Sequence, residues 1–366
     1  MPTKKKVVYL FGTGASQAEA SLIDDTVRLL MDDIREGILS KMIKKNNNRF
    51  KQIRDELAAE SADVEQLITL FESSGNKAHQ DAARFLKSQF RAEIEERLQK
   101  LDGGGRFVPK LCAAMIDMHR ITGFNEELMG IITLNYEDII ERAGQHVQGC
   151  INYHLKLGKD CNTSIKYRKS GLVVLKLHGS FNWKNEFPIS VHDHLGKDNE
   201  VIWIPPGVEK HPDDYPFNII WGKARELLDC DILRMVGCSL SRNDWHLVSL
   251  LYETQKLNKS KKSYTIEIID YPEAGEEIAG KYPHLRPLKI IYELPEIREF
   301  VYGDLYKLST PGTMARLSDD TISNYLAKQK NIFDIWLRAK GEEIIKNSLT
   351  VDPVRNKDFN SYIRGA

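Results

Sequence analysis

The sequence predicts an α/β protein whose mainly parallel sheet is covered by helices on both faces. Short apolar runs recur along the chain and end in glycine, asparagine, histidine or aspartate, as buried parallel strands often do. Helical patterns lie between several of these runs, and strands that alternate with helices favour a parallel sheet. A long stretch with helical periodicity follows the first run directly and predicts a large helical insertion.

The predicted strands are short and mostly apolar, as is typical of strands that are buried on both faces. They lie at 7–11, 130–133, 172–177, 201–204, 231–236 and 264–269, with helical patterns at 219–229 and 244–257 among them. We therefore expect a Rossmann-like domain built from residues 1–17 and 130–310. A helical C-terminal extension is expected over 311–366, because apolar residues recur at helical spacing between residues 315 and 350.

The predicted insertion spans residues 18–129. Leu86, Phe90, Ile94 and Leu98 recur every fourth residue, which is the spacing of one helix face, and the glycines at 103–105 interrupt the pattern. The amphipathic helices between residues 50 and 100 carry more apolar surface than one sheet face needs. We therefore expect the protein to form homo-oligomers.

Composition excludes several classes of protein. Lysine plus arginine and aspartate plus glutamate both number 52, so overall charge gives no argument for binding nucleic acid or a membrane surface. No apolar run approaches the roughly 20 residues that span a bilayer, and the run at 7–11 is too short for a signal peptide. The five cysteines form no Cys-x-x-Cys pair, so we expect a cytoplasmic protein without a disulfide framework or bound metal.

Four segments place small or polar residues directly after a predicted strand. Because ligands of an open α/β sheet bind beyond the carboxyl ends of its strands, we expect the four to meet at one crevice. The first segment contains Gly12, Gly14, Ala15 and Ser16. Its glycines suit a close approach of the backbone to a pyrophosphate, with the following helix start offering N–H groups. An ordinary strand–turn–helix connection is the alternative.

The second segment contains Thr133, Asn135 and Asp138. An asparagine at a strand end can hold a ribose hydroxyl or a water molecule, because its carboxamide both donates and accepts. The alternative is that Asn135 or Asp138 caps a helix predicted at 138–143.

The third and fourth segments are centred on His178 and Gly237. Imidazole is the side chain best suited to move a proton near neutral pH, although a histidine that only satisfies local hydrogen bonds is the commoner case. Gly237 and Ser239 suit contact with a ribose or phosphate, whereas the intervening Cys238 is expected to be a small buried residue. Asp270 ends another strand and suits adenosine ribose hydroxyls, with a simple turn aspartate as the equal alternative.

Together, in this order, the four segments resemble the motifs of the sirtuin superfamily. The resemblance covers about 7–16 and 130–270, and it implies NAD as the substrate, with Asn135 and His178 as the catalytic residues. It implies binding of NAD by Gly12, Gly14, Ala15, Ser16, Thr133, Asp138, Gly237, Ser239 and Asp270.

The sequence departs from the sirtuin deacylases in ways that weigh against a deacylase. The segment 20–25 lacks the proline and arginine of their first loop, Glu137 replaces the aspartate expected after Asn135, and no cysteine of a zinc module occurs between Phe181 and Val201. The pair His192 and His194 has no third metal ligand near it in the sequence, so a solvated loop is the expected role.

The sequence keeps the motifs of the NAD-cleaving core without these deacylase features, and in this it most resembles the sirtuin-like NAD hydrolases of bacterial anti-phage defence. That resemblance implies hydrolysis of NAD to nicotinamide and ADP-ribose, NAD depletion as an antiviral defence, and a possible HerA-type ATPase as partner. Two alternatives stay open: a protein deacylase or ADP-ribosyltransferase, and a non-catalytic subunit that binds NAD or ADP-ribose within a larger complex.

Overall fold

The computed structural model describes residues 4–292 except 25, 45–50, 60–62, 103–108, 118, 120–125, 194–200, 206–212, 242, 259–263, 271 and 286–287. The predicted C-terminal extension at 311–366 and the glycines at 103–105 lie outside the described residues.

The described residues form a seven-stranded sheet in which all neighbouring strands are parallel. Its spatial order is β10-β9-β8-β1-β2-β4-β3. The strands are β1 (Lys5–Phe11), β2 (Glu126–Thr133), β3 (Ile151–Asn152), β4 (Leu172–Lys176), β8 (Ile232–Val236), β9 (Thr265–Ile269) and β10 (Leu288–Tyr292). The predicted Rossmann-like α/β class is confirmed.

Strand β1 lies at the centre of this sheet, where the direction of strand addition reverses. Strands β2 and β4 extend the sheet on one side of β1, and β8, β9 and β10 extend it on the other. Phe11, the last residue of β1, pairs with Thr133 of β2 and with Val236 of β8. The loops after β1, β2 and β8 therefore leave the sheet at one edge, which is where doubly wound sheets bind ligands.

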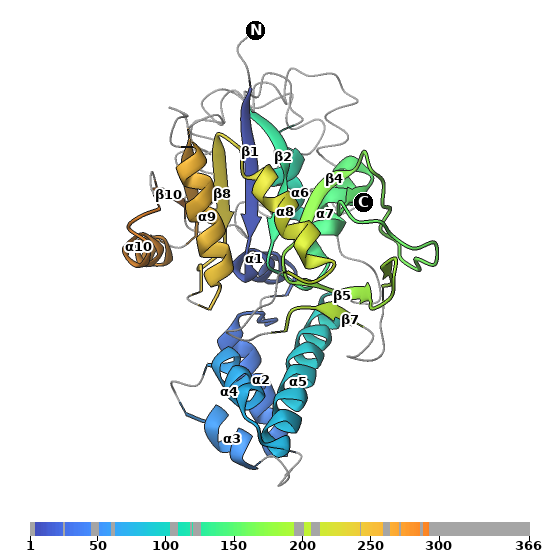
Figure 1. Ribbon diagram of the computed structural model, residues 1–366, viewed down its shortest axis with the longest axis vertical. Coiled ribbons are helices and arrows are strands. Elements are labelled where there is room, and N and C mark those ends of the chain that lie inside the picture. Colours follow the sequence, from blue (N-terminus) through green and yellow to red (C-terminus); the bar gives the residue numbers. More distant parts are fainter. Residues whose placement is uncertain are drawn as a thin grey trace.

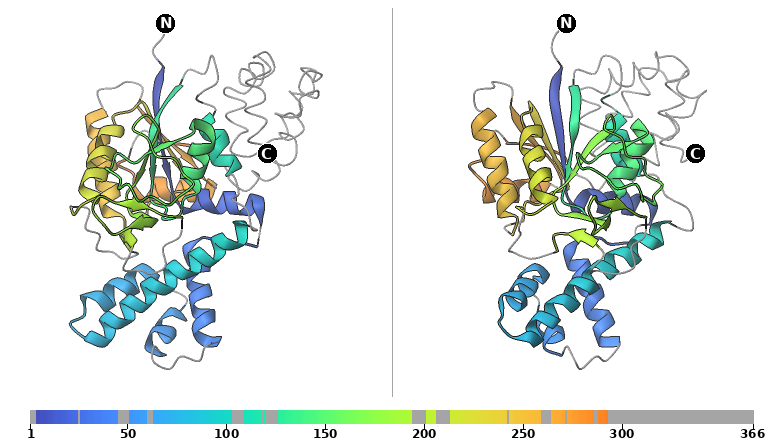
Figure 2. Two further views of the ribbon diagram at one scale, coloured as in Figure 1. Left: turned by 90° about the vertical axis from the view of Figure 1, so that its right-hand side faces the viewer. Right: turned by 45° about the vertical axis from the view of Figure 1, so that its right-hand side comes forward.

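Helices cover both faces of the sheet (Figures 1 and 2). One face carries α1 (Thr13–Ile23), α6 (Lys110–Asp117) and α7 (Ile139–Gln148), and the other carries α8 (Phe217–Leu227) and α9 (Trp245–Asn258). Helix α10 (Pro272–Lys281) contacts β10. Helices α1 and α6, which fall largely within the predicted insertion, thus belong to the layers of the sheet domain.

The rest of the insertion forms a separate helical layer beyond the carboxyl ends of the strands (Figure 1). This layer consists of α2 (Met31–Lys44), α3 (Lys51–Leu57), α4 (Val64–Ser73) and α5 (Lys77–Asp102). The apolar faces of these helices bury one another in a core that includes Ile38, Ile68 and Leu86. Apolar surface from which we expected homo-oligomers is thus partly buried within the chain, and the homo-oligomer stays a prediction.

The predicted strand at 201–204 lies in a different sheet from the one expected. It is β7 (Val201–Trp203), which pairs antiparallel with β5 (Gly179–Lys184), as does β6 (Ser190–Val191). Gly179 at the start of β5 has φ +76°, and a Cβ there would lie 2.5 Å from the Ile202 carbonyl oxygen. A glycine is therefore required where the chain leaves β4 and doubles back along β7.

A buried ionic network joins four strands of the main sheet. Arg234 on β8 makes two hydrogen bonds to the carboxylate of Glu126, of 2.8 and 2.9 Å, and one of 2.7 Å to Glu267. The Tyr9 hydroxyl lies 3.0 Å from Nε2 of His119, and burial holds the pKa of that histidine well below its usual value. Because Arg234 neutralises two buried carboxylates at once, it is the group on which the network depends.

The glycine turns after β1 and β8 pack directly on each other. The Gly12 and Gly14 amides donate to the carbonyl oxygens of Val236 and Gly237, at 3.0 and 2.9 Å. Gly237 has φ +55°, and a Cβ on it would lie 2.2 Å from the Ala15 nitrogen. These glycines are thus needed to bring two loops together at the centre of the sheet edge, whatever they bind.

Replacing Gly237 with alanine is expected to lower the free energy of unfolding by more than about 1 kcal/mol, because the backbone is left-handed and the added Cβ meets main-chain atoms. Gly222, within α8, is the matched control: nothing lies within 4 Å of an added Cβ. Gly222→Ala is expected to stabilise the protein by about 0.5–1 kcal/mol. Denaturant unfolding of both variants measures the difference, and equal effects would contradict the close packing described here.

Candidate active site

Asn135 is held rigidly at the carboxyl end of β2. Its amide nitrogen Nδ2 donates to the Gly12 carbonyl oxygen at 3.0 Å and to the Ser16 hydroxyl at 2.8 Å, so both of its hydrogens are used. The side chain does not cap the helix that follows. Its carbonyl oxygen Oδ1 is buried and has no hydrogen-bond partner among the described residues. Asn135 therefore presents an oriented, unsatisfied acceptor.

Glu137 completes this group of polar side chains. The Ser16 hydroxyl donates to its carboxylate, so one chain of hydrogen bonds runs from Asn135 through Ser16 to Glu137. Burial raises the pKa of Glu137, while the nearby Lys176 acts in the opposite direction. The sequence singled out Glu137 only as a departure from the sirtuin motif, yet its carboxylate lies at the site.

Lys176 fixes the loop that carries Asn135 and Glu137. It is fully buried at the end of β4, donates to the Glu137 carbonyl oxygen, and forms an ion pair of 2.8 Å with Glu141 of α7. The Tyr153 hydroxyl donates to the same carboxylate. A buried lysine is tolerated here because carboxylate and carbonyl oxygens surround its charge.

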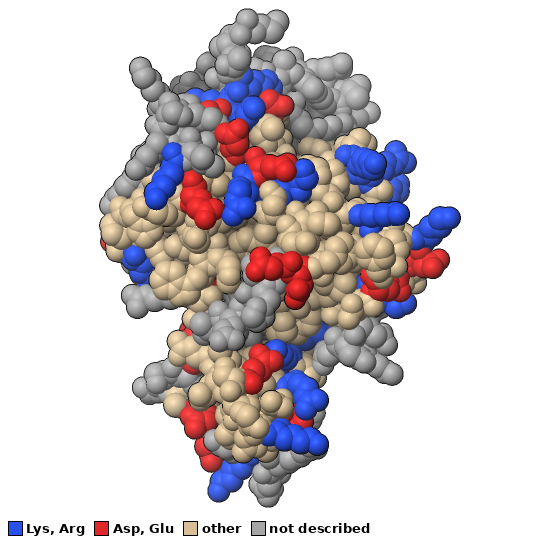
Figure 3. Space-filling view, in the orientation of Figure 1, with Lys and Arg blue, Asp and Glu red and all other residues tan. Residues whose placement is uncertain are grey.

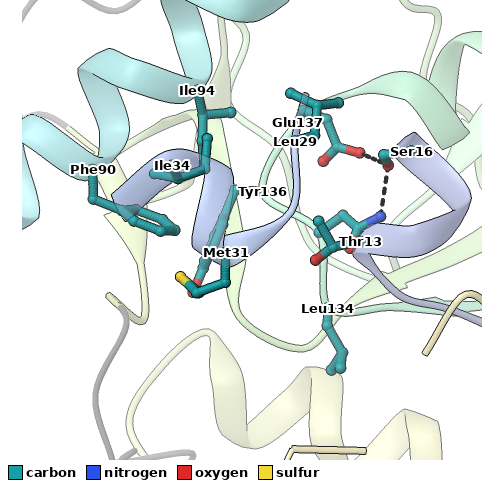
Figure 4. Close-up of a pocket in the computed structure, with 11 residues that line it drawn as sticks. Thr13, Ser16, Leu29, Met31, Ile34, Phe90, Ile94, Leu134, Tyr136 and Glu137 are labelled. Atoms are coloured by element: carbon teal, nitrogen blue, oxygen red, sulfur yellow. Dashed lines mark hydrogen bonds between the residues drawn. The ribbon is translucent and has the colours of Figure 1, made fainter. Parts of the chain in front are cut away.

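A cavity of about 70 Å³ opens beside these polar groups, between the sheet edge and the helical layer (Figure 4). Its polar floor comes from Thr13, Ser16, Asn135 and Glu137. Its apolar lining comes from the helical layer and the segment before it, and also from the loop that carries Asn135: Leu29, Met31, Ile34, Phe90, Ile94, Leu134 and Tyr136. An apolar pocket with a few convergent polar groups is the usual form of a small-molecule site.

His178 lies at the same edge of the sheet as Asn135. Thr133 and Lys176, the last residues of β2 and β4, pair with each other, and each predicted catalytic residue follows two positions after its strand. His178 is 4% exposed, and its Nε2 lies 3.6 Å from a carboxylate oxygen of Asp244. It does not line the cavity, because the Tyr136 ring, 6.2 Å away between centroids, stands on the cavity side.

The other predicted binding residues divide into two groups. Thr133 stabilises the turn: its hydroxyl donates to the Phe11 carbonyl oxygen and accepts a hydrogen bond from the backbone N–H of Asn135. Asp138 precedes α7 without a side-chain capping bond and instead pairs with Arg142 at 2.9 Å. The structure brings Ser16 and Asn135 to the cavity, but neither Thr133 nor Asp138 lines it.

The residues predicted around β8 and β9 surround the glycine turns. Ala15 is fully buried between the turns, Ser239 is exposed, and Asp270 is 8% exposed at the end of β9. Cys238 is buried, as expected, and burial raises the pKa of its thiol to about 12. A thiol with this pKa is no nucleophile near neutral pH.

The helical layer is tied to the sheet domain next to His178. Nδ2 of Asn243, in the loop before α9, bonds to carboxylate oxygens of Asp63 at 3.1 Å and Glu65 at 2.8 Å. Asp63 also caps α4 by accepting from the Glu65 and Gln66 amides. Sequence reasoning missed this contact, because it joins loops almost two hundred residues apart that carry no shared motif.

Neither the distribution of charged side chains nor the placement of possible metal ligands indicates a nucleic-acid or metal site among the described residues. On the face shown in Figure 3, basic and acidic side chains are interspersed over the sheet domain and the helical layer. Within the part of the chain that the structure describes, no group of three or more histidine, cysteine, aspartate or glutamate residues is placed to hold a metal ion. His194 lies outside the described residues. Among the described helices, none has both the length and the apolar character needed to cross a membrane.

Comparison with known protein families gives a match over part of the chain. Residues 129–286 match the family model of the SIR2-like domain. The range holds Asn135, His178 and Gly237, whereas the β1 turn and the helical layer lie outside it. No protein with a curated description matches the sequence.

One solved structure that matches is a serine-to-alanine mutant of a Sir2 homologue in complex with ADP-ribose. The two chains are 17% identical, and the match covers 77% of this chain and 92% of that one, with a TM-score of 0.35.

Proposed function

We propose that this chain is an NAD glycohydrolase, which cleaves the bond between nicotinamide and ribose to give nicotinamide and ADP-ribose. The observation that carries the proposal is Asn135: a buried carboxamide with both N–H groups satisfied and its oxygen unsatisfied, beside a cavity and within the range that matches the SIR2-like domain. Such an oxygen accepts a hydrogen bond from a ribose hydroxyl or from the attacking water.

Cleavage of the bond between nicotinamide and ribose needs no general acid. Nicotinamide leaves as a neutral molecule from a cationic ring, so the enzyme needs to hold the ribose, stabilise positive charge at the anomeric carbon and admit water. In this proposal Asn135 orients the ribose or the water. His178 accepts the proton released when water adds, which requires the Tyr136 ring to move aside when NAD binds. Asp244, 3.6 Å from Nε2, favours the protonated imidazole that results.

The remaining contacts of the proposal place the dinucleotide across the sheet edge. Gly12, Gly14, Ala15 and Ser16 hold the pyrophosphate side, and Gly237, Ser239 and Asp270 the adenosine ribose side. The cavity of about 70 Å³ is smaller than the about 300–1,000 Å³ of drug-sized ligand pockets. We therefore infer that the wall formed by Met31, Phe90 and their neighbours moves away from the sheet edge when NAD binds.

The direct test is to incubate the purified chain with NAD, without any protein acceptor, and to measure nicotinamide and ADP-ribose by chromatography. The proposal expects equal molar release of both. Release that requires an acylated peptide or acceptor protein would replace it with a deacylase or ADP-ribosyltransferase. Binding of NAD without release would replace it with a non-catalytic subunit.

The biological setting belongs to the same proposal and rests on the resemblance stated above. We propose that NAD depletion serves antiviral defence in the cytoplasm, with self-association and a HerA-type ATPase as the partner. Measuring the mass of the chain in solution, alone and with such an ATPase, tests both associations.

A further inference from the structure

The chain of hydrogen bonds at the cavity has a direction, and Glu137 sets it. The Gly12 carbonyl oxygen can only accept, so the Asn135 atom 3.0 Å from it is the nitrogen. That nitrogen also donates to Ser16, so the Ser16 hydroxyl must send its own hydrogen elsewhere. The carboxylate of Glu137 receives it.

If Glu137 did not accept its hydrogen, the Ser16 hydroxyl could rotate, and its lone pair would no longer be held toward Asn135. A hydroxyl that turned its hydrogen toward Asn135 would favour the flipped carboxamide, with the oxygen on Ser16 and the nitrogen in the place now taken by the oxygen. Gly12 opposes that flip, and Ser16 opposes it only while it donates to Glu137. A bond to a carboxylate is about twice as strong as one between neutral groups.

We propose that Glu137 is a positioning residue that, through Ser16, keeps the carboxamide oxygen of Asn135 turned toward the ligand. The inference rests on the proposed function for its consequence in catalysis, but the hydrogen-bond chain itself can be measured without NAD. Glu137 acts through Ser16 and Asn135 and is not required to touch the substrate.

The burial of Glu137 is consistent with this role. The groups that interact with it come from four elements: Ser16 of α1, Cys112 of α6, Glu141 of α7 and Lys176 of β4. Glu19 of α1 acts, like Glu137, to raise the pKa of the Cys112 thiol. Lys176 favours the ionised carboxylate, whereas burial and Glu141 oppose it, and the net effect raises the pKa of Glu137. The ionised form, which binds Ser16 most strongly, is therefore gained as pH rises through this raised pKa and lost as pH falls.

The raised pKa of Glu137 also means that its carboxylate destabilises the folded protein at high pH, which is not expected of a residue that serves only to stabilise the fold. Because the folded protein binds the Glu137 proton more tightly than the unfolded chain, ionisation of Glu137 weakens the fold. Glu137→Gln, which keeps the size and one acceptor oxygen, is expected to melt at a temperature equal to or higher than that of the parent at neutral pH.

Kinetics supply the first test. Glu137→Gln is expected to lower kcat for NAD about tenfold above the pKa of Glu137, and Glu137→Met, which cannot accept from Ser16, by more than this. The ratio of parent to Glu137→Gln rates should shrink toward one as pH falls. The matched control is Glu127→Gln, on the exposed side of β2, which should leave kcat unchanged. A ratio that does not change with pH would overturn the proposal.

The second test needs no substrate. In protein labelled with ¹⁵N only at asparagine, the side-chain NH₂ signal of Asn135 is identified by its loss in Asn135→Asp. We expect this signal to shift with pH in the parent, over the range in which the protein is folded, and to stay constant in Glu137→Gln. A signal that does not shift in the parent, or shifts equally in both, would refute the hydrogen-bond chain even if NAD is hydrolysed. A shift without any NAD hydrolysis would uphold the chain and refute the proposed function.

Discussion

His178→Ala is expected to slow nicotinamide release about 10²–10⁴-fold, which is the usual contribution of one general base. His178 follows β4 at a position equivalent to that of Asn135 after β2, and its Nε2 lies 3.6 Å from Asp244. In the proposed function, its removal takes away the group that accepts the proton from water. Initial rates of nicotinamide release at saturating NAD measure the effect.

The control for this variant is His246→Ala. His246 is exposed at the start of α9, two residues after Asp244, and should lose little activity. Thermal unfolding of both variants establishes that the loss is not one of folding. If His178→Ala hydrolyses NAD as fast as the parent, the role assigned to the imidazole is wrong.

The largest effect on stability is expected from Arg234→Met. This change leaves Glu126 and Glu267 buried without their counter-charge, and breaking a buried ion pair from one side costs about 3–5 kcal/mol. A lowered free energy of unfolding in denaturant is the expected result, together with less folded protein at moderate temperature.

Arg225→Met is the matched comparison. Arg225 and its partner Glu253 are 58% and 52% exposed, and a surface pair of this kind contributes between zero and about 1 kcal/mol. Equal losses in the two variants would mean that the Arg234 network does not stabilise the sheet as described.

The sequence was sufficient to predict much of the sheet and the edge at which the site lies. Apolar runs that end in Gly12, Asn135, His178 and Gly237 predict buried strands, and parallel strands bring their carboxyl ends together. The strand β7 was assigned to the wrong sheet, because three residues of apolar pattern do not indicate which strand they pair with. Gly179 and its positive φ gave the chain the turn that decided the pairing.

The wall of the cavity could not be predicted. Phe90 and Ile94 repeat at helical spacing and would have suited any buried helix face, yet they line the cavity opposite Asn135. Which apolar residues face a ligand depends on how α5 docks on the sheet edge, and that depends on contacts such as Asn243 with Asp63 and Glu65.

The sequence by itself determined the order of strands and turns, and with it the polar residues that reach one edge of the sheet, because period and turn chemistry are local properties. Only the tertiary structure decided that Glu137, and not Asp138, bonds to Ser16, and that the side-chain oxygen of Asn135 has no hydrogen-bond partner within the described part of the chain. The physical reason is that a hydrogen-bond direction depends on every partner around the group. Here Gly12 and Ser16, from the turn after β1 and the start of α1, lie 123 and 119 residues from Asn135 in the chain and become its neighbours only once the sheet has formed.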